Sequence, residues 1–262
     1  MAQPLAGGID ADGFILAAPT ARLQPQFLAL LDDACASLAQ SGSLLDGIYL
    51  YGSIARGDAR PGVSDLDLTL VLRDPPAPQD MQTLEAVRVA LEARHAEVIK
   101  IDFDIGCRAE VLAPENRFSW GYWLKHHCRR LWGNDLADRF EPFRPSLAIA
   151  KAVNAGFEAT LTRYATLIDD ATSDAVACRL QREASRKLVR ATQVLRSEHE
   201  LRWPQTLDEH VELFVQCYPS TRSQVEFFLS QAKSPDKADK AFSTRLRSLL
   251  TWMVAVDKAR GF

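Results

Sequence analysis

Apolar residues in the first half of the chain recur with two different periods, which predict helices and strands in turn. Through residues 21–41 and 79–95 they return at three- and four-residue steps, the spacing of one helix face. From Leu66 to Leu72 a leucine stands at every second position, which predicts a strand with one face in the core. Residues 48–51 and 98–105 are further strand candidates. This order of elements predicts a small mixed sheet with helices against one face.

From residue 147 onward the strand pattern disappears and helical periods take over. An aromatic-rich helix is expected near Trp120–Arg130, before this change. We therefore predict an α/β (α+β) fold, with a small mixed-sheet domain over residues 1–143 followed by an all-helical bundle over 144–262. The first ~20 residues are interpreted as a flexible lead-in. The predicted helices of the second half cover residues 147–169, 175–200, 207–217, 220–233 and 237–258.

Composition narrows the class of protein further. The chain has 262 residues, 47% of them hydrophobic and 25% charged, as in an ordinary globular protein. No uninterrupted apolar run is long enough to span a membrane, and the N-terminus does not resemble a secretory signal. The five cysteines are widely spaced, which argues against a disulfide framework or a zinc site. These features favour a cytoplasmic protein without a membrane partner.

Charge is distributed unevenly between the two halves. Residues 1–146 carry 14 Lys and Arg against 20 Asp and Glu, whereas residues 147–262 carry 17 against 14. The predicted helix over 175–200 has a stripe of basic side chains, among which Lys187 and Arg190 are candidates for contact with a nucleotide. The alternative is that the stripe is the solvated face opposite a core face.

Three carboxylates provide the candidate chemistry. Asp65 and Asp67 lie two positions apart in a predicted strand, so both point to one face, about 7 Å apart. Asp102 follows 35 residues later on the polar face of the next predicted strand. Magnesium takes one or two carboxylates together with substrate phosphates. Three carboxylates on adjacent strands can therefore hold two Mg²⁺ ions, one at an attacking oxygen and one at a leaving pyrophosphate.

A Gly-Ser turn precedes the carboxylates. Gly52 allows the backbone to approach a phosphate closely, and Ser53 can donate to a phosphate oxygen from the start of a short helix. Arg56, one turn further on, can neutralise triphosphate charge. Taken separately, the turn and the acidic strand are common surface features. Their combination, in this order and with a third acidic strand, favours a catalytic site.

The two motifs resemble the signature of a known superfamily. Gly-Ser-Ile-Ala-Arg-Gly over residues 52–57, followed by Ser-Asp-Leu-Asp-Leu over 64–68, resembles the DNA polymerase beta-type nucleotidyltransferases. With the following helical half and the Leu-Trp-Gly-Asn-Asp-Leu stretch over 131–136, the chain is most similar to aminoglycoside adenylyltransferases.

This resemblance implies transfer of a nucleoside monophosphate, usually AMP from ATP, onto a hydroxyl with release of pyrophosphate. It implies that Ser53, with Ser64 of the same motif, contacts the nucleotide, and that Asp65 and Asp67 bind Mg²⁺. The third acidic position falls on Asp102 or Asp104, which point the same way. Asp102 is preferred because it follows the apolar Ile101.

The acceptor is less well defined than the reaction. A small hydroxylated molecule such as an aminoglycoside suits the acidic N-terminal half, because a polycation is attracted to excess negative charge. The basic excess of the helical half points instead to tRNA or a protein hydroxyl as the acceptor. A third hypothesis is a catalytically inactive nucleotide-binding protein, against which the retention of the acidic positions, Ser53 and Arg56 argues.

Overall fold

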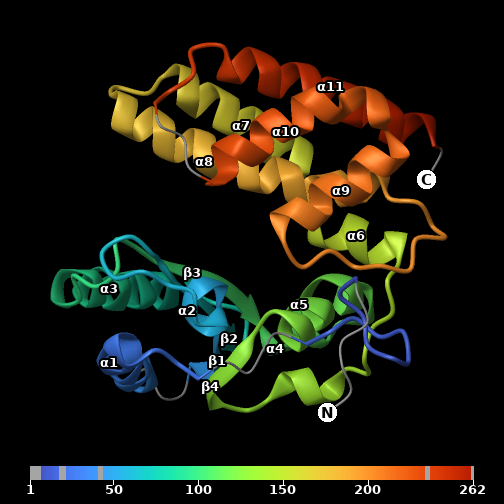
Figure 1. Cartoon of the computed structure of the whole chain (residues 1–262). Helices are drawn as coiled ribbons and strands as arrows, with labels where there is room; N and C mark the ends of the chain where they lie inside the picture. The colour runs from blue at the N-terminus through green and yellow to red at the C-terminus, as the bar shows by residue number, and fades with distance from the viewer. Residues whose placement is uncertain (1–6, 18–21, 41–43, 234–236, 261–262) are drawn as a thin grey trace. The chain divides into compact units, whose positions relative to one another are not determined.

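The chain divides into two compact units, one built around a β-sheet and one built from helices (Figure 1). The computed structural model describes residues 7–17, 22–40, 44–233 and 237–260. The sheet unit covers Leu16–Phe143, and the helical unit combines the N-terminal residues up to Ile15 with Arg144–Phe262. Each unit is described by itself below.

A four-stranded mixed sheet forms the centre of the first unit. The strands β1 (Leu45–Tyr51), β2 (Leu66–Leu72), β3 (Ile101–Cys107) and β4 (Arg129–Gly133) stand in the order β3-β2-β1-β4. Neighbouring strands are antiparallel except for β2 and β3, which are parallel. Helix α3 (Pro78–Arg94) makes the crossover that such a parallel pair requires. The mixed sheet and the helical second unit confirm the predicted fold class.

Period-two alternation places the leucines of β2 on one face, where they form the main core of this unit. Leu66, Leu68 and Leu70 are fully buried against α1 (Leu28–Ala39) and α3.

The helix predicted over residues 21–41 is shorter in the structure, where α1 covers Leu28–Ala39. A 3₁₀ turn, Pro25–Phe27, precedes α1, and the predicted ends at residues 21 and 41 lie outside the described residues.

The opposite face of the sheet is also covered, so the prediction of helices against one face only was wrong. Tyr49 and Val71 are buried there with Leu124 in a second apolar cluster. Short helices after β3 provide this cover because the chain returns across the sheet before forming β4. They are α4 (Arg108–Leu112), a π-helical turn (Arg117–Gly121) and α5 (Tyr122–His126).

Strand β4 also corrects a prediction. The helix expected near Trp120–Arg130 ends at His126, and Arg129–Gly133 pairs with β1 instead, with Trp132 opposite Ile48. The third strand starts later than predicted, at Ile101 rather than at residue 98.

The second unit is a bundle whose helices bury one apolar core. The predicted helix over 147–169 is broken after Val153, where α6 ends, and α7 begins after Gly156, whose φ is +69°. The predicted helix over 175–200 stops at Ala191, followed by a 3₁₀ turn, Thr192–Leu195. The helices are α6 (Leu147–Val153), α7 (Phe157–Asp169), α8 (Asp174–Ala191), α9 (Leu207–Cys217), α10 (Arg222–Lys233) and α11 (Phe242–Ala259).

Residues 7–15, which the sequence interpretation assigned to a lead-in, contact the helical unit. The backbone N–H of Trp203 donates to the Gly7 carbonyl at 2.6 Å. The Arg144 guanidinium lies 4.2 Å from the ring centroid of Phe14. Across the described residues, no helix has both the length and the apolar character needed to cross a membrane.

Candidate functional site

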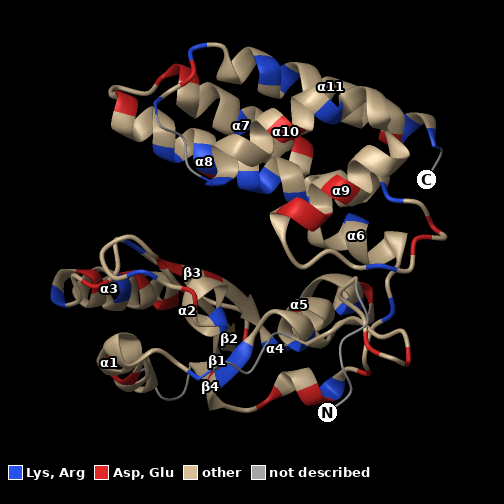
Figure 2. Ribbon diagram, in the orientation of Figure 1, with Lys and Arg blue, Asp and Glu red and all other residues tan. Residues whose placement is uncertain are grey.

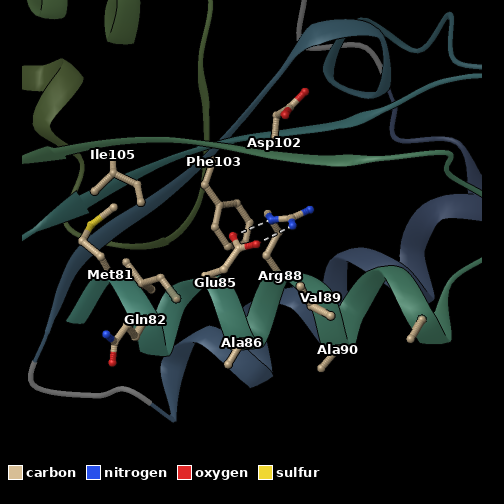
Figure 3. Close-up of a pocket in the computed structure, with 12 residues that line it drawn as sticks. Met81, Gln82, Glu85, Ala86, Arg88, Val89, Ala90, Asp102, Phe103 and Ile105 are labelled. Atoms are coloured by element: carbon tan, nitrogen blue, oxygen red, sulfur yellow. Dashed lines mark hydrogen bonds and ion pairs between the residues drawn. The ribbon is translucent and has the colours of Figure 1, made fainter. Parts of the chain in front are cut away.

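The topology brings one end of each of three strands to the same edge of the sheet. Because β1 and β2 are antiparallel and β2 and β3 parallel, the end of β1 lies beside the starts of β2 and β3. Tyr51 is paired with Asp67, and Asp67 with Asp102, so these three residues form a row across the sheet. Figure 3 shows Asp102 pointing away from α3 and Phe103 pointing toward it. The row therefore lies on the face opposite the main core.

The turn after β1 fits closely against this row. Helix α2 (Gly52–Arg56) starts directly after Tyr51, with Ser53 as its second residue. Gly52 has φ +74°, and an added Cβ would lie 2.8 Å from the carboxylate carbon of Asp67. A glycine is therefore required here, both by the backbone conformation and by the space that the carboxylate occupies.

Negative charge is concentrated around Asp67. Burial, followed by the charges of Asp65 and Asp102, raises the pKa of Asp67 to about 7, while the Arg56 guanidinium acts in the opposite direction. Arg56 itself is 43% exposed at its side chain and lies 3.4 Å from Asp58. The arrangement thus combines mutually repelling carboxylates with one exposed arginine, which is the electrostatic environment that attracts a divalent cation.

Asp65 directly precedes β2, at the end of a loop that Ser64 closes. The Ser64 hydroxyl accepts a hydrogen bond from the Arg60 backbone N–H at 2.9 Å, and its carbonyl accepts one from Ile99 at 3.2 Å. Through these two hydrogen bonds Ser64 stabilises the loop that precedes Asp65. Its contact with a nucleotide stays a prediction.

The two candidates for the third carboxylate, Asp102 and Asp104, have different surroundings. Asp102 lies level with Asp67 and forms an ion pair with Lys100 at 2.7 Å. Asp104 lies level with Thr69, two residues further along the strand, and is exposed. The Tyr51 hydroxyl donates to Asp104 Oδ2 at 2.8 Å. Burial, followed by the charge of Asp104, raises the pKa of Tyr51, so the phenol keeps its proton.

The donor set fits magnesium in its chemistry. Carboxylate oxygens are the ligands Mg²⁺ prefers, and one or two of them suffice when substrate phosphates complete the coordination. Among the described residues, no group of three or more His, Cys, Asp or Glu side chains stands together as a ready-made metal site. Asp67, with Asp65 and Asp102 close enough to raise its pKa, is the centre around which such a site would form.

Lys187 and Arg190 lie on α8, in the helical unit, where Figure 2 shows basic residues along the helix. Burial, followed by the charge of Arg190, lowers the pKa of Lys187. Their role in nucleotide binding stays a prediction.

Sequence reasoning missed a network beside the carboxylates. The Trp123 indole donates to Thr69 Oγ1 at 3.0 Å, and its ring meets the Tyr51 ring edge-on at 4.9 Å between centroids. Because residues two positions apart in a strand point to the same face, the sequence could have predicted that Tyr51 shares a face of the sheet with Tyr49. Nothing in the sequence indicates that Trp123 reaches it.

A separate open groove lies between α3 and the edge strand β3 (Figure 3). Its lining is mostly apolar, with Met81, Val89 and Phe103 among its residues, and Asp102 stands at its rim. The Arg88–Glu85 ion pair crosses its floor. The groove is on the core side of β3, and Asp102 is the residue that it shares with the row of Tyr51, Asp67 and Asp102.

The mixed sheet places Asp67 and Asp102 level on neighbouring strands, next to a glycine turn and a short helix, which is the arrangement expected from the resemblance to nucleotidyltransferases. Comparison with known proteins agrees. Residues 33–119 match the family model described as a nucleotidyltransferase domain. This part of the chain is therefore similar to nucleotidyltransferase domains, as the motifs predicted.

The whole chain has a more particular likeness. It is similar to the crystal structure of spectinomycin adenyltransferase AAD(9) from Enterococcus faecialis with ATP and spectinomycin. The TM-score is 0.59 and the identity 14%, over 86% of this chain and 98% of that chain. The likeness is one of fold, and the domain match supports nucleotidyl transfer in general. No curated protein sequence matches this chain.

Proposed function

We propose that the protein is a Mg²⁺-dependent adenylyltransferase that transfers AMP from ATP to a hydroxyl of a small acceptor molecule and releases pyrophosphate. The observation that carries this proposal is the row of Asp67 and Asp102 beside the Gly52 turn. The domain match supports nucleotidyl transfer in general. The turn supports a nucleoside triphosphate, the oxygen ligands support Mg²⁺, and the ATP in the similar solved structure supports adenosine as the nucleoside.

In this proposal the turn binds the triphosphate. The backbone N–H groups at the start of α2 and the Ser53 hydroxyl donate to phosphate oxygens, and Gly52 lets them approach. Arg56 pairs with Asp58 at the protein surface, and such an exposed ion pair readily exchanges one partner for a phosphate. These residues hold the α-phosphate in place for in-line attack.

Asp65, Asp67 and Asp102 would hold the magnesium ions. When bound, magnesium neutralises the charge that develops on the transferred phosphate and on the leaving pyrophosphate. The acceptor oxygen forms a bond to the α-phosphorus while the bond to the bridging oxygen of pyrophosphate breaks. Asp102 accepts the proton of the acceptor hydroxyl, for which its half-exposed carboxylate at the end of the row is suited.

A small hydroxylated acceptor is favoured by two observations. The sheet unit carries the excess of acidic residues, which attracts a polycation. The structurally similar spectinomycin adenyltransferase was solved with ATP and spectinomycin.

Incubation with Mg²⁺ and ATP labelled at the α-phosphate tests the proposal. The acceptors are spectinomycin, an aminoglycoside panel, bulk tRNA and a cell lysate, each with wild type and with Asp67→Asn as the matched control. Label in a small molecule, seen only with the wild type, is the expected result. Label in tRNA or protein would replace the small molecule as the acceptor. No label despite binding of Mg²⁺-ATP would indicate a catalytically inactive nucleotide-binding protein.

A further inference from the structure

We infer that Tyr51 is a positioning residue that selects between the two carboxylates of β3, holding Asp104 aside so that Asp102 serves as the third acidic group of the site. This inference rests on the proposed metal-binding role of the carboxylates. Tyr51 lies at the end of β1, level with Asp67 and directly before Gly52. It therefore stands at the point where the turn and the row of carboxylates meet.

The phenol is the donor in its contact with Asp104. Tyr51 Oη donates to Asp104 Oδ2 at 2.8 Å, a charge-assisted hydrogen bond from a neutral hydroxyl to a carboxylate. The bond joins β1 to β3 across β2, which lies between them in the sheet. Because the two strands are not neighbours, side-chain reach alone determines which aspartate the phenol can hold.

The Tyr51 ring is itself fixed from the other side. Trp123 packs edge-on against it at 4.9 Å, and the Trp123 indole is held by its hydrogen bond to Thr69 at 3.0 Å and by stacking on His127 at 4.9 Å. Thr69 lies level with Asp104 in the parallel pair. Trp123 thus links the Tyr51 ring to Thr69 on β2, the strand that also carries Asp67. These contacts fix the orientation of the Tyr51 ring.

Asp102 is held in a different way. Its partner is the Lys100 ammonium, 2.7 Å away, and both side chains are substantially exposed, at 51% for Lys100 and 39% for Asp102. An exposed ion pair of this kind contributes little and exchanges readily. A divalent cation can therefore replace Lys100 at Asp102, whereas at Asp104 it must compete with a neutral donor attached to a fixed ring.

Removing the Tyr51 hydroxyl should free Asp104 to compete with Asp102 as an oxygen ligand of the metal. Tyr51→Phe keeps the ring and its packing against Trp123 and deletes only the donor. The matched control is Tyr49→Phe, on the same strand and face, whose hydroxyl instead bonds Asn134 and Leu136 at 2.7 and 2.9 Å. Asp104→Asn, alone and combined with Tyr51→Phe, tests whether the freed carboxylate causes the effect.

The measurements are calorimetric titration with Mn²⁺ alone and steady-state transfer of labelled AMP with Mg²⁺. For Tyr51→Phe we expect Mn²⁺ to bind about threefold or more tightly, because an oxygen ligand is gained. We expect kcat to fall about tenfold with the KM for ATP little changed, because the metal shifts away from its productive position while the turn still binds the nucleotide. The double variant should return both values toward the wild type.

A merely structural role for Tyr51 would weaken Mn²⁺ binding and lower kcat together, and Asp104→Asn would not reverse either. That pattern would overturn the inference. So would a Tyr51→Phe variant with the Mn²⁺ affinity and kcat of the wild type, or a wild type that binds no Mn²⁺. If the wild type binds Mn²⁺ and transfers no AMP, the proposed function fails while the metal titration still decides the role of Tyr51.

Discussion

Replacing Gly52 by alanine tests the close fit between the turn and the carboxylates. The residue has φ +74°, a conformation that costs a side chain with a Cβ about 1–2 kcal/mol. The new Cβ would lie 2.8 Å from the carboxylate carbon of Asp67 and closer still to one of its oxygens, so the carboxylate or the turn must move. A displacement of about 1 Å at a reacting centre costs on the order of 100-fold in rate.

We therefore expect Gly52→Ala to lower kcat/KM for AMP transfer about 100-fold. The free energy of unfolding should fall by about 1–3 kcal/mol. Gly156→Ala is the matched control, because Gly156 has a similar φ of +69° and nothing lies within 4 Å of its added Cβ. It should lose comparable stability and keep its activity.

Urea unfolding followed by circular dichroism measures the stability of both variants, and the transfer of α-labelled AMP measures their activity. The reasoning is refuted if Gly52→Ala transfers AMP within about threefold of Gly156→Ala, a difference of less than about 1 kcal/mol in the barrier.

Three further predictions concern other parts of the chain. Asp65→Asn should remove nearly all AMP transfer while the far-ultraviolet circular dichroism and melting temperature stay those of the wild type. Asp46→Ala should lower the free energy of unfolding by about 2 kcal/mol in urea titration, since Asp46 is 2% exposed and pairs with Arg108 at 2.8 Å. That is less than the cost of breaking a fully buried pair, because the Arg108 side chain is 35% exposed. Burial acts to lower the pKa of His95, but the hydrogen-bonded carboxylates of Asp33 and Glu97 outweigh it, so the pKa is raised. The stabilisation of the folded state by protonated His95 is therefore complete below about pH 6.5 and disappears as the pH rises through the folded-state pKa. His95→Gln should therefore lower the melting temperature more at pH 6 than at pH 9.

Each of these has a clear contrary result. Full transfer by Asp65→Asn would remove that aspartate from the site. An unchanged unfolding curve for Asp46→Ala would mean that the buried ion pair with Arg108 adds nothing. A His95→Gln deficit that grows with pH would reverse the assigned direction of the pKa shift.

The elements that depend on local periodicity could be predicted from the sequence. The leucines from Leu66 to Leu72 define β2 because alternation reports burial directly. Strand β4 could not be predicted, because Arg129–Gly133 has no alternation of its own and is a strand only through pairing with β1. The predicted helix over 175–200 ran too far because its apolar spacing continues beyond Ala191, where the helix ends.

The site divides in the same way. The order of Gly52, Asp65 and Asp67 is a local pattern, so these site residues could be proposed from the sequence. The sequence supports a preference for Asp102 over Asp104 only through the apolar Ile101 before it. The role inferred for Tyr51 in that choice depends on strand register and on a hydroxyl 53 residues away in the sequence. Register and long-range hydrogen bonds leave no periodic signal in the chain.

The central claim is that the nucleoside monophosphate, and not the terminal phosphate, moves to the acceptor. Parallel reactions with Mg²⁺, the acceptor that takes up label in the panel above, and ATP labelled either at the α- or at the γ-phosphate measure this directly. The account predicts that the α-label enters the acceptor and the γ-label leaves as pyrophosphate, and that Asp67→Asn abolishes both. Transfer of the γ-label to the acceptor, or equal labelling by Asp67→Asn, would contradict it.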